Sequence, residues 1–122
     1  MKFFVLDDMQ ERHDWFSKAL RGRGTVWHAH TVAEAKVMLD EHRFDVAFLD
    51  HDLDCTDHTR DGLHVAQYIA AMPSDERPAN VVVHSWNVDG ARRMVDAVNR
   101  QGVPATYAPF GQEKLSRIVG SL

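Results

Sequence analysis

A single cysteine, no surplus of positive charge and no long apolar run set the first limits on this 122-residue chain. Cys55 has no second cysteine with which to form an intrachain disulfide, so we expect a reducing compartment. The 14 lysines and arginines stand against 18 aspartates and glutamates, a formal net charge of -4. That balance argues against an extensive DNA-binding face, and it leaves room for a small basic pocket that binds one nucleotide.

The apolar segments are too short to cross a membrane. None approaches the roughly 18 consecutive apolar residues that a bilayer-spanning helix requires. The first residues, 1–6, lead directly into Asp7 and Asp8 and have no small-residue cleavage site, so we expect no signal peptide. We therefore expect a cytoplasmic protein that has no membrane partner.

Length and composition indicate one globular domain over residues 1–122. A chain of 122 residues can bury a core without help from a disulfide or a structural metal. Hydrophobic residues make up 44% of the sequence and charged residues 26%, which is ordinary for a globular protein.

Strand-like and helix-like segments alternate from one end of the chain to the other. Short apolar runs, rich in β-branched and aromatic residues, predict strands at residues 2–6, 25–30, 44–49, 81–83 and 103–107. Apolar residues at helical spacing predict helices at about 9–21, from Thr31, from Asp61 to Pro73, at about 88–100 and around Leu115. Thr31 with Glu34 three residues later forms a capping box.

Five successive strand–helix units predict an α/β fold, a five-stranded parallel sheet with helices on both faces. The flavodoxin-like strand order 2-1-3-4-5 is the common arrangement for five such units with right-handed crossovers. In this order strands one and three are neighbours at the switch point, where ligands bind beyond the carboxyl ends of the strands.

Acidic side chains follow both of those strands. Asp7 and Asp8 end strand one, whereas Asp50 and Asp52 follow strand three. Carboxylates packed closely cannot all stay ionised unaided, and oxygen ligands of this kind suit Mg²⁺ or Mn²⁺, whose open positions bind phosphate oxygens. We therefore predict a divalent cation held by these four aspartates. The plain alternative is that they cap helices and build turns.

The whole chain resembles a response-regulator receiver domain. The acidic pair 7–8, Asp50 after the third strand, Ser85 after the fourth and the Pro-Phe pair at 109–110 match the receiver pattern. Receivers carry a lysine before that proline, and this sequence has Ala108 there. The resemblance implies a receiver phosphorylated at Asp50, and the missing lysine argues against that activity.

A more specific resemblance is to the cyclic-phosphate-processing receiver-like domain, a divergent branch of the same fold. It rests on three motifs in order: the acidic pair at 7–8, His-Asp-Leu at 51–53 and His-Ser-x-Asn at 84–87. The resemblance implies a metal-dependent phosphodiesterase or phosphate-processing domain that acts on a cyclic nucleotide or an RNA end.

Three residues are candidates for the chemical step: Asp50, His51 and His84. Imidazole titrates near neutral pH, so one histidine would accept a proton from water and the other would protonate the leaving oxygen, unless either is a metal ligand. The plain alternatives are a solvated loop residue for His51 and a core histidine for His84. Cys55 has no partner pattern that makes it a convincing nucleophile.

Four further residues are candidates for binding the substrate. Ser85 and Asn87 would donate hydrogen bonds to phosphate, Trp86 would stack on a base, and Arg12 would reach a phosphate. Arg60 is a further candidate for that last role. The alternatives are a helix cap for Ser85 and partial core for Trp86.

The remaining histidines and the rival functions complete the predictions. His28 and His30 follow no ligand pattern, and His58 lies close to the crevice in sequence. Besides an enzyme, the residues allow a phosphorylated receiver that switches a partner, a non-catalytic cyclic-nucleotide binder, or a scaffold without a ligand. For the enzyme and for the non-catalytic binder, the expected partner is a small phosphate-bearing ligand. The oligomeric state stays open.

Overall fold

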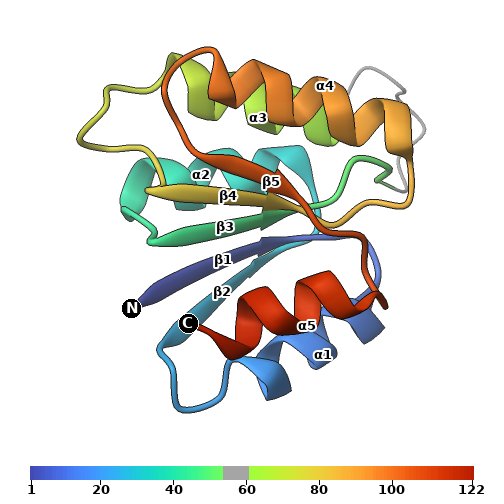
Figure 1. Ribbon diagram of the computed structural model, residues 1–122. Helices are drawn as coiled ribbons and strands as arrows, with labels where there is room; N and C mark the ends of the chain where they lie inside the picture. Colours follow the sequence, from blue (N-terminus) through green and yellow to red (C-terminus); the bar gives the residue numbers. More distant parts are fainter. Residues whose placement is uncertain (54–60) are drawn as a thin grey trace.

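A parallel five-stranded sheet in the order β2-β1-β3-β4-β5 forms the centre of the protein, as predicted. The computed structural model describes residues 1–53 and 61–122, so the predictions for Cys55, His58 and Arg60 lie outside the described residues. The strands, drawn as arrows in Figure 1, are β1 (Lys2–Leu6), β2 (Thr25–Ala29), β3 (Val46–Leu49), β4 (Asn80–Val83) and β5 (Ala105–Tyr107).

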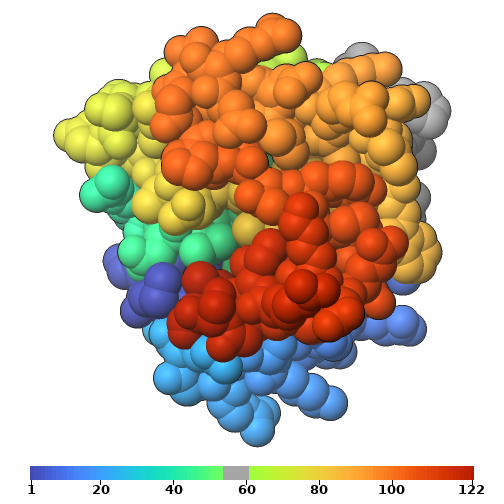
Figure 2. All heavy atoms as spheres, in the orientation of Figure 1, coloured from blue at the N-terminus to red at the C-terminus, as the bar shows by residue number. Residues whose placement is uncertain are grey.

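Helices cover both faces of the sheet (Figure 1). Helices α1 (Gln10–Ala19) and α5 (Glu113–Gly120) lie on one face, and α2 (Val32–Glu41), α3 (Gly62–Ala71) and α4 (Val88–Asn99) lie on the other. Figure 2 shows α5, in red, between α1 in blue and α4 in orange. In the described part of the chain, no helix combines the length and apolar character that a membrane crossing needs.

Each face of the sheet has its own apolar core, because successive strand side chains point to opposite sides. Phe4 and Leu6 pack towards α2, α3 and α4, whereas Phe3 and Val5 pack towards α1 and α5. All four side chains are fully buried. Burial on both faces explains why these strands are continuous apolar runs and not alternating ones.

Three helices begin with a side chain that accepts a hydrogen bond from the first turn. Thr31 Oγ1 accepts from the Glu34 amide at 3.1 Å, Asp61 Oδ1 from the Leu63 amide at 3.0 Å, and Asn87 Oδ1 from the Gly90 amide at 2.9 Å. Such caps satisfy amides that the helix leaves unpaired. Asp61 and Asn87 also lie beside His51, at 3.4 Å from its Nε2 and 3.3 Å from its Nδ1, so two of these caps flank that imidazole.

The strand register brings three strand ends level with one another. Leu6 of β1 is paired with Leu49 of β3, and Leu49 is paired with Val83 of β4. The next residues, Asp7, Asp50 and His84, therefore leave the sheet side by side.

Candidate metal and phosphate site

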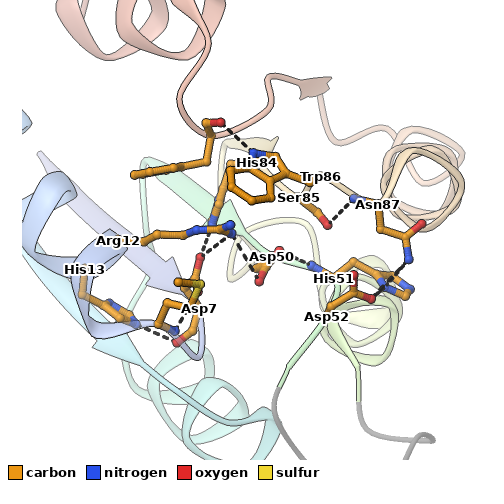
Figure 3. A network of polar contacts seen from close by, with 12 residues as sticks. Asp7, Arg12, His13, Asp50, His51, Asp52, His84, Ser85, Trp86 and Asn87 are labelled. Atoms are coloured by element: carbon orange, nitrogen blue, oxygen red, sulfur yellow. Dashed lines mark hydrogen bonds and ion pairs between the residues drawn. The ribbon is translucent and has the colours of Figure 1, made fainter.

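Asp7, Asp50 and His84 form a buried polar cluster at the carboxyl edge of the sheet (Figure 3). Each follows the last residue of its strand directly, and one ligand atom of each lies within 4.8 Å of the others. Their exposed fractions are 0%, 3% and 0%. The sheet thus brings together two carboxylates and an imidazole that are far apart in the sequence.

His84 is a neutral imidazole with one ring nitrogen left over. Its Nε2 lies 2.8 Å from Asp7 Oδ2, and burial lowers the pKa of the imidazole although the bond to Asp7 opposes that shift. Nε2 therefore carries the ring proton and donates a hydrogen bond to the carboxylate, so Nδ1 keeps a lone pair. Among the described residues, this buried Nδ1 has no hydrogen-bond partner.

Arg12 reaches into the same cluster from the first turn of α1. Its Nη1 lies 3.3 Å from Asp7 Oδ2 and 3.7 Å from Asp50 Oδ2. The guanidinium is stacked against two rings, 4.7 Å from the centroid of Trp86 and 5.0 Å from that of Phe110. Figure 3 shows Arg12 directed at both carboxylates, so this predicted phosphate ligand already has two anionic partners.

The two carboxylates respond differently to this environment. Burial raises the pKa of Asp7, but the hydrogen bonds from His84 and the Met9 amide, together with nearby positive charge, outweigh it and lower that pKa. Burial and the charge of Asp7 raise the pKa of Asp50 to about 7, in spite of Arg12. One guanidinium thus faces two carboxylates, and Asp50 is the one of the two that takes up a proton more readily.

The donor set fits a divalent cation, on the condition that Arg12 moves. Carboxylate oxygens suit Mg²⁺ and Mn²⁺, and an imidazole nitrogen, which His84 offers to the cluster, is a donor type that Mn²⁺ accepts more readily than Mg²⁺. Arg12, however, contacts the Oδ2 atoms of both carboxylates, which are the atoms nearest a cation between them. The cluster could hold an ion in the place of the guanidinium.

The other predicted ligands, Asp8 and Asp52, are not members of this cluster. Asp8 is half-buried. Asp52 has an exposed side chain, and its Oδ1 lies 2.7 Å from His51 Nδ1 and 3.2 Å from Asn87 Nδ2. Their assignment as metal ligands stays a prediction.

His51 is buried beside the cluster, unlike the solvated loop residue of the plain alternative. Only 8% of the residue is exposed. Nδ1 is bonded to Asp52, whereas Nε2 lies 3.4 Å from Asp61 Oδ2 without the geometry of a hydrogen bond and has no hydrogen-bond partner in the described structure. The imidazole is therefore held firmly at one nitrogen and loosely at the other.

The segment after β4 is fastened to the segment after β5. Trp86 Nε1 donates to the Phe110 carbonyl at 2.8 Å, and the Tyr107 hydroxyl donates to the Ser85 carbonyl at 2.8 Å. Ser85 Oγ accepts from the Asn87 amide at 3.0 Å. Trp86 is 67% exposed, so it is not the partial-core residue of the plain alternative. These bonds fix the indole at the surface above Arg12.

Comparison with known families decides the identity of the chain. The family model described as Cyclic-phosphate processing Receiver domain matches residues 2–100. The chain belongs to this family. Within this cyclic-phosphate receiver, the His-Asp-Leu and His-Ser-x-Asn motifs supply His51 and His84, which lie beside and within the cluster. No curated protein matches the chain.

Solved structures support the receiver fold of the family. A response regulator from Burkholderia pseudomallei is 21% identical with a TM-score of 0.72; the match covers 98% of this chain and 65% of that one. A CheY-like receiver domain from Methylobacillus flagellatus is 17% identical with a TM-score of 0.73, over 99% and 97%. An adenylate cyclase from Rhodopirellula baltica is 14% identical with a TM-score of 0.72, over 98% and 84%. At these identities the likeness shows the fold alone.

Sequence reasoning missed a row of histidines on the outer side of Asp7. His13 Nε2 bonds to the Asp7 carbonyl at 2.7 Å, His13 Nδ1 faces His28 Nδ1 at 2.6 Å, and Ser17 Oγ lies 3.0 Å from His28 Nε2. Because a carbonyl only accepts, His13 donates from Nε2 and accepts at Nδ1, so the cyclic-phosphate receiver orients the main chain of Asp7 through these rings. The sequence signal was His28, which alternates with apolar neighbours in β2.

Proposed function

We propose that this domain processes a phosphodiester with the help of Mg²⁺ or Mn²⁺ held by Asp7, Asp50 and His84. The observation that carries the proposal is the cluster itself: its ligand atoms lie within 4.8 Å of one another, and burial together with the charge of Asp7 raises the pKa of Asp50 to about 7. The family description points to a cyclic phosphate as the substrate class. When bound, the cation would polarise a phosphoryl oxygen and lower the pKa of coordinated water.

His51 is the better candidate for moving a proton. Its Nδ1 lies 2.7 Å from Asp52 Oδ1, and its Nε2 lies 3.4 Å from Asp61 Oδ2 and has no hydrogen-bond partner in the described structure. A histidine oriented by a carboxylate at one nitrogen, and without a hydrogen bond at the other, has the arrangement of a general base once water or substrate reaches the buried Nε2. His84 is bonded to Asp7 and fully buried, so we assign it to holding Asp7 and to offering one ring nitrogen to the ion.

We assign the phosphate and the nucleobase of the ligand to different parts of the site. The start of α4, which follows Ser85 and Asn87, is the positive end of the helix dipole and favours an anion. The indole of Trp86 is exposed and tied down through Nε1, so it presents a fixed surface on which a nucleobase can stack. The ligand class is therefore a cyclic nucleotide or an RNA terminus with a cyclic phosphate.

A panel of 2′,3′-cyclic and 3′,5′-cyclic nucleotides and cyclic-phosphate RNA ends tests the proposal. Each compound is incubated with the protein and Mg²⁺ or Mn²⁺, and the products are separated by chromatography. We expect conversion of at least one compound, a loss of about a hundredfold or more in Asp50→Asn and His51→Ala, and no loss in Asp75→Asn, which changes an exposed carboxylate in the turn before β4. Unchanged ligand that nevertheless binds would identify a non-catalytic binder. A scaffold would show no rise in melting temperature with the metal.

The second candidate function is a receiver phosphorylated at Asp50. It is favoured by the fold neighbours, among them the Burkholderia response regulator that carries a phosphorylated aspartate and a calcium ion. Against it stands Ala108, which is fully buried where receivers have their lysine. Formation of a phosphoryl-aspartate from a small-molecule donor, absent in Asp50→Asn, would support this function instead.

A further inference from the structure

Arg12 is the one cation that the structure pairs with both carboxylates of the cluster among the described residues. We infer that Arg12 couples the binding of the metal to the binding of the phosphate: a divalent cation displaces the guanidinium from Asp7 and Asp50, and the displaced guanidinium then binds the phosphodiester. The inference rests on the proposed function, because it concerns the same site. It adds an order to the binding, in which neither ligand binds well alone.

The metal and the guanidinium compete for the same atoms. Asp7 Oδ1 accepts from the Met9 amide at 2.8 Å, and Asp50 Oδ1 accepts from the His51 amide at 2.9 Å. The Oδ2 atoms of both carboxylates face Arg12. A cation between the carboxylates would take those Oδ2 atoms, so it cannot bind while Arg12 keeps its present contacts.

The present contacts of Arg12 are long enough to exchange. A well-formed hydrogen bond between a guanidinium and a carboxylate measures about 2.7–2.9 Å. Here the distances from Nη1 are 3.3 Å to Asp7 and 3.7 Å to Asp50, and the second is an ion pair without a hydrogen bond. Arg12 thus neutralises the carboxylates through long contacts, whereas a small divalent ion would bind the same oxygens at a shorter distance.

The two rings around Arg12 keep the guanidinium at the site after it leaves the carboxylates. Trp86 and Phe110 contact the guanidinium at 4.7 and 5.0 Å, and the bond from Trp86 Nε1 to the Phe110 carbonyl holds the two together. Arg12 is 7% exposed, and a guanidinium buried to this degree requires an anion. Phosphate oxygens match the two-pronged donor geometry of arginine.

Charge balance gives the class of anion. When both carboxylates are ionised, they and Arg12 sum to one negative charge, and a divalent cation converts this sum to one positive charge. A phosphodiester carries one negative charge and neutralises the cluster, so each ligand improves the site for the other. By linkage the increase in affinity must be the same in both directions.

Calorimetric titration of the full chain with Mg²⁺, at constant ionic strength, tests the coupling. Dimethyl phosphate serves as the singly charged diester and trimethyl phosphate as the neutral control. We expect dimethyl phosphate to lower the dissociation constant of Mg²⁺ by about fivefold or more, and trimethyl phosphate to leave it unchanged. Arg12→Gln should bind Mg²⁺ alone more tightly than the wild type and should show no response to dimethyl phosphate, whereas Arg12→Lys should retain the response.

Two results would overturn the inference. One is a wild-type affinity for Mg²⁺ that does not change with dimethyl phosphate; the other is a folded Arg12→Gln protein that binds Mg²⁺ more weakly than the wild type. If Arg12→Gln does not fold, the wild-type titration and Arg12→Lys decide. Coupling without turnover of any cyclic phosphate would contradict the proposed function and leave the inference standing, and turnover without coupling would do the reverse.

Discussion

The backbone of Gly90 lies so close to the imidazole of His51 that a β-carbon at residue 90 would come within 2.5 Å of Cγ of the ring. Gly90 is in the first turn of α4, where its amide donates to Asn87 Oδ1. The absence of a side chain therefore lets α4 pack directly against His51. This contact keeps the ring beside Asp52, whose carboxylate orients it.

We predict that Gly90→Ala destabilises the protein, although alanine is the better helix former by about 1 kcal/mol. The ring of His51 must move, and overpacking of this kind costs about 1–3 kcal/mol. The free energy of unfolding in urea measures the effect. Gly120→Ala is the matched control, because that helical glycine has no neighbouring atom within 4 Å of the added carbon. Equal effects of the two substitutions would refute the close contact.

Asp50 predicts a fall in stability as the pH rises. Its pKa is raised from 3.8 to about 7 in the folded chain, so between these values the folded protein binds a proton that the unfolded chain does not. The contribution of Asp50 to the free energy of unfolding is therefore fully present below pH 3.8. It is lost as the pH rises towards 7, by at most about 4 kcal/mol.

Unfolding experiments in buffer with EDTA, at several pH values from 5 to 8, measure that loss. Asp50→Asn should show a smaller decrease than the wild type and should be the more stable protein at pH 8, because the amide carries no charge. Parallel curves for the two proteins would mean that Asp50 is ionised in the fold at every pH tested.

Replacing Arg12 should reveal its interaction with Asp50. Arg12→Met leaves two buried carboxylates without compensation and should lower the free energy of unfolding by about 3 kcal/mol at pH 8 without metal. In the Asp50→Asn background the same substitution should cost less by about 1 kcal/mol or more. Additive effects in this double-mutant cycle would show that the ion pair at 3.7 Å contributes nothing.

Asn87 has two roles that substitutions can separate. Its Oδ1 caps α4, and its Nδ2 donates to Asp52 at 3.2 Å. Asn87→Ala should cost about 1 kcal/mol of stability and should also reduce turnover, whereas Thr31→Ala, which removes the cap of α2, should affect stability alone. Asn87→Ser should restore stability and leave turnover low. Full turnover in Asn87→Ser would show that the amide is not needed.

The order of the strands could be predicted from the sequence, because apolar runs and helical spacing report directly on which side chains are buried. The exact starts of strands could not. Phe44 and Val103 are buried as expected, yet β3 begins at Val46 and β5 at Ala105. Pro104, which lacks an amide proton, interrupts the ladder at the start of β5, and a buried residue need not be a paired one.

The composition of the site was less predictable than its position. Asp7, Asp50 and His84 follow strands that neighbour one another, so their meeting follows from topology. The partners of Arg12 depend on where the third residue of a helix points and on two rings from other segments, and no spacing in the sequence encodes that. The hydrogen-bonded row of His13, His28 and Ser17 could not be predicted for the same reason, since it joins β2 to α1 through side chains only.

The raised pKa of Asp50 has a consequence for how the sequence of this protein can change in evolution. Because the ionisation of this carboxylate opposes folding, replacing Asp50 by asparagine gives a more stable protein. Substitutions that raise stability would therefore remove this metal ligand before they changed the sheet. Homologues with asparagine at this position should therefore be stable domains that no longer bind a cation. Among relatives, the melting temperature without metal should fall as the affinity for the metal rises.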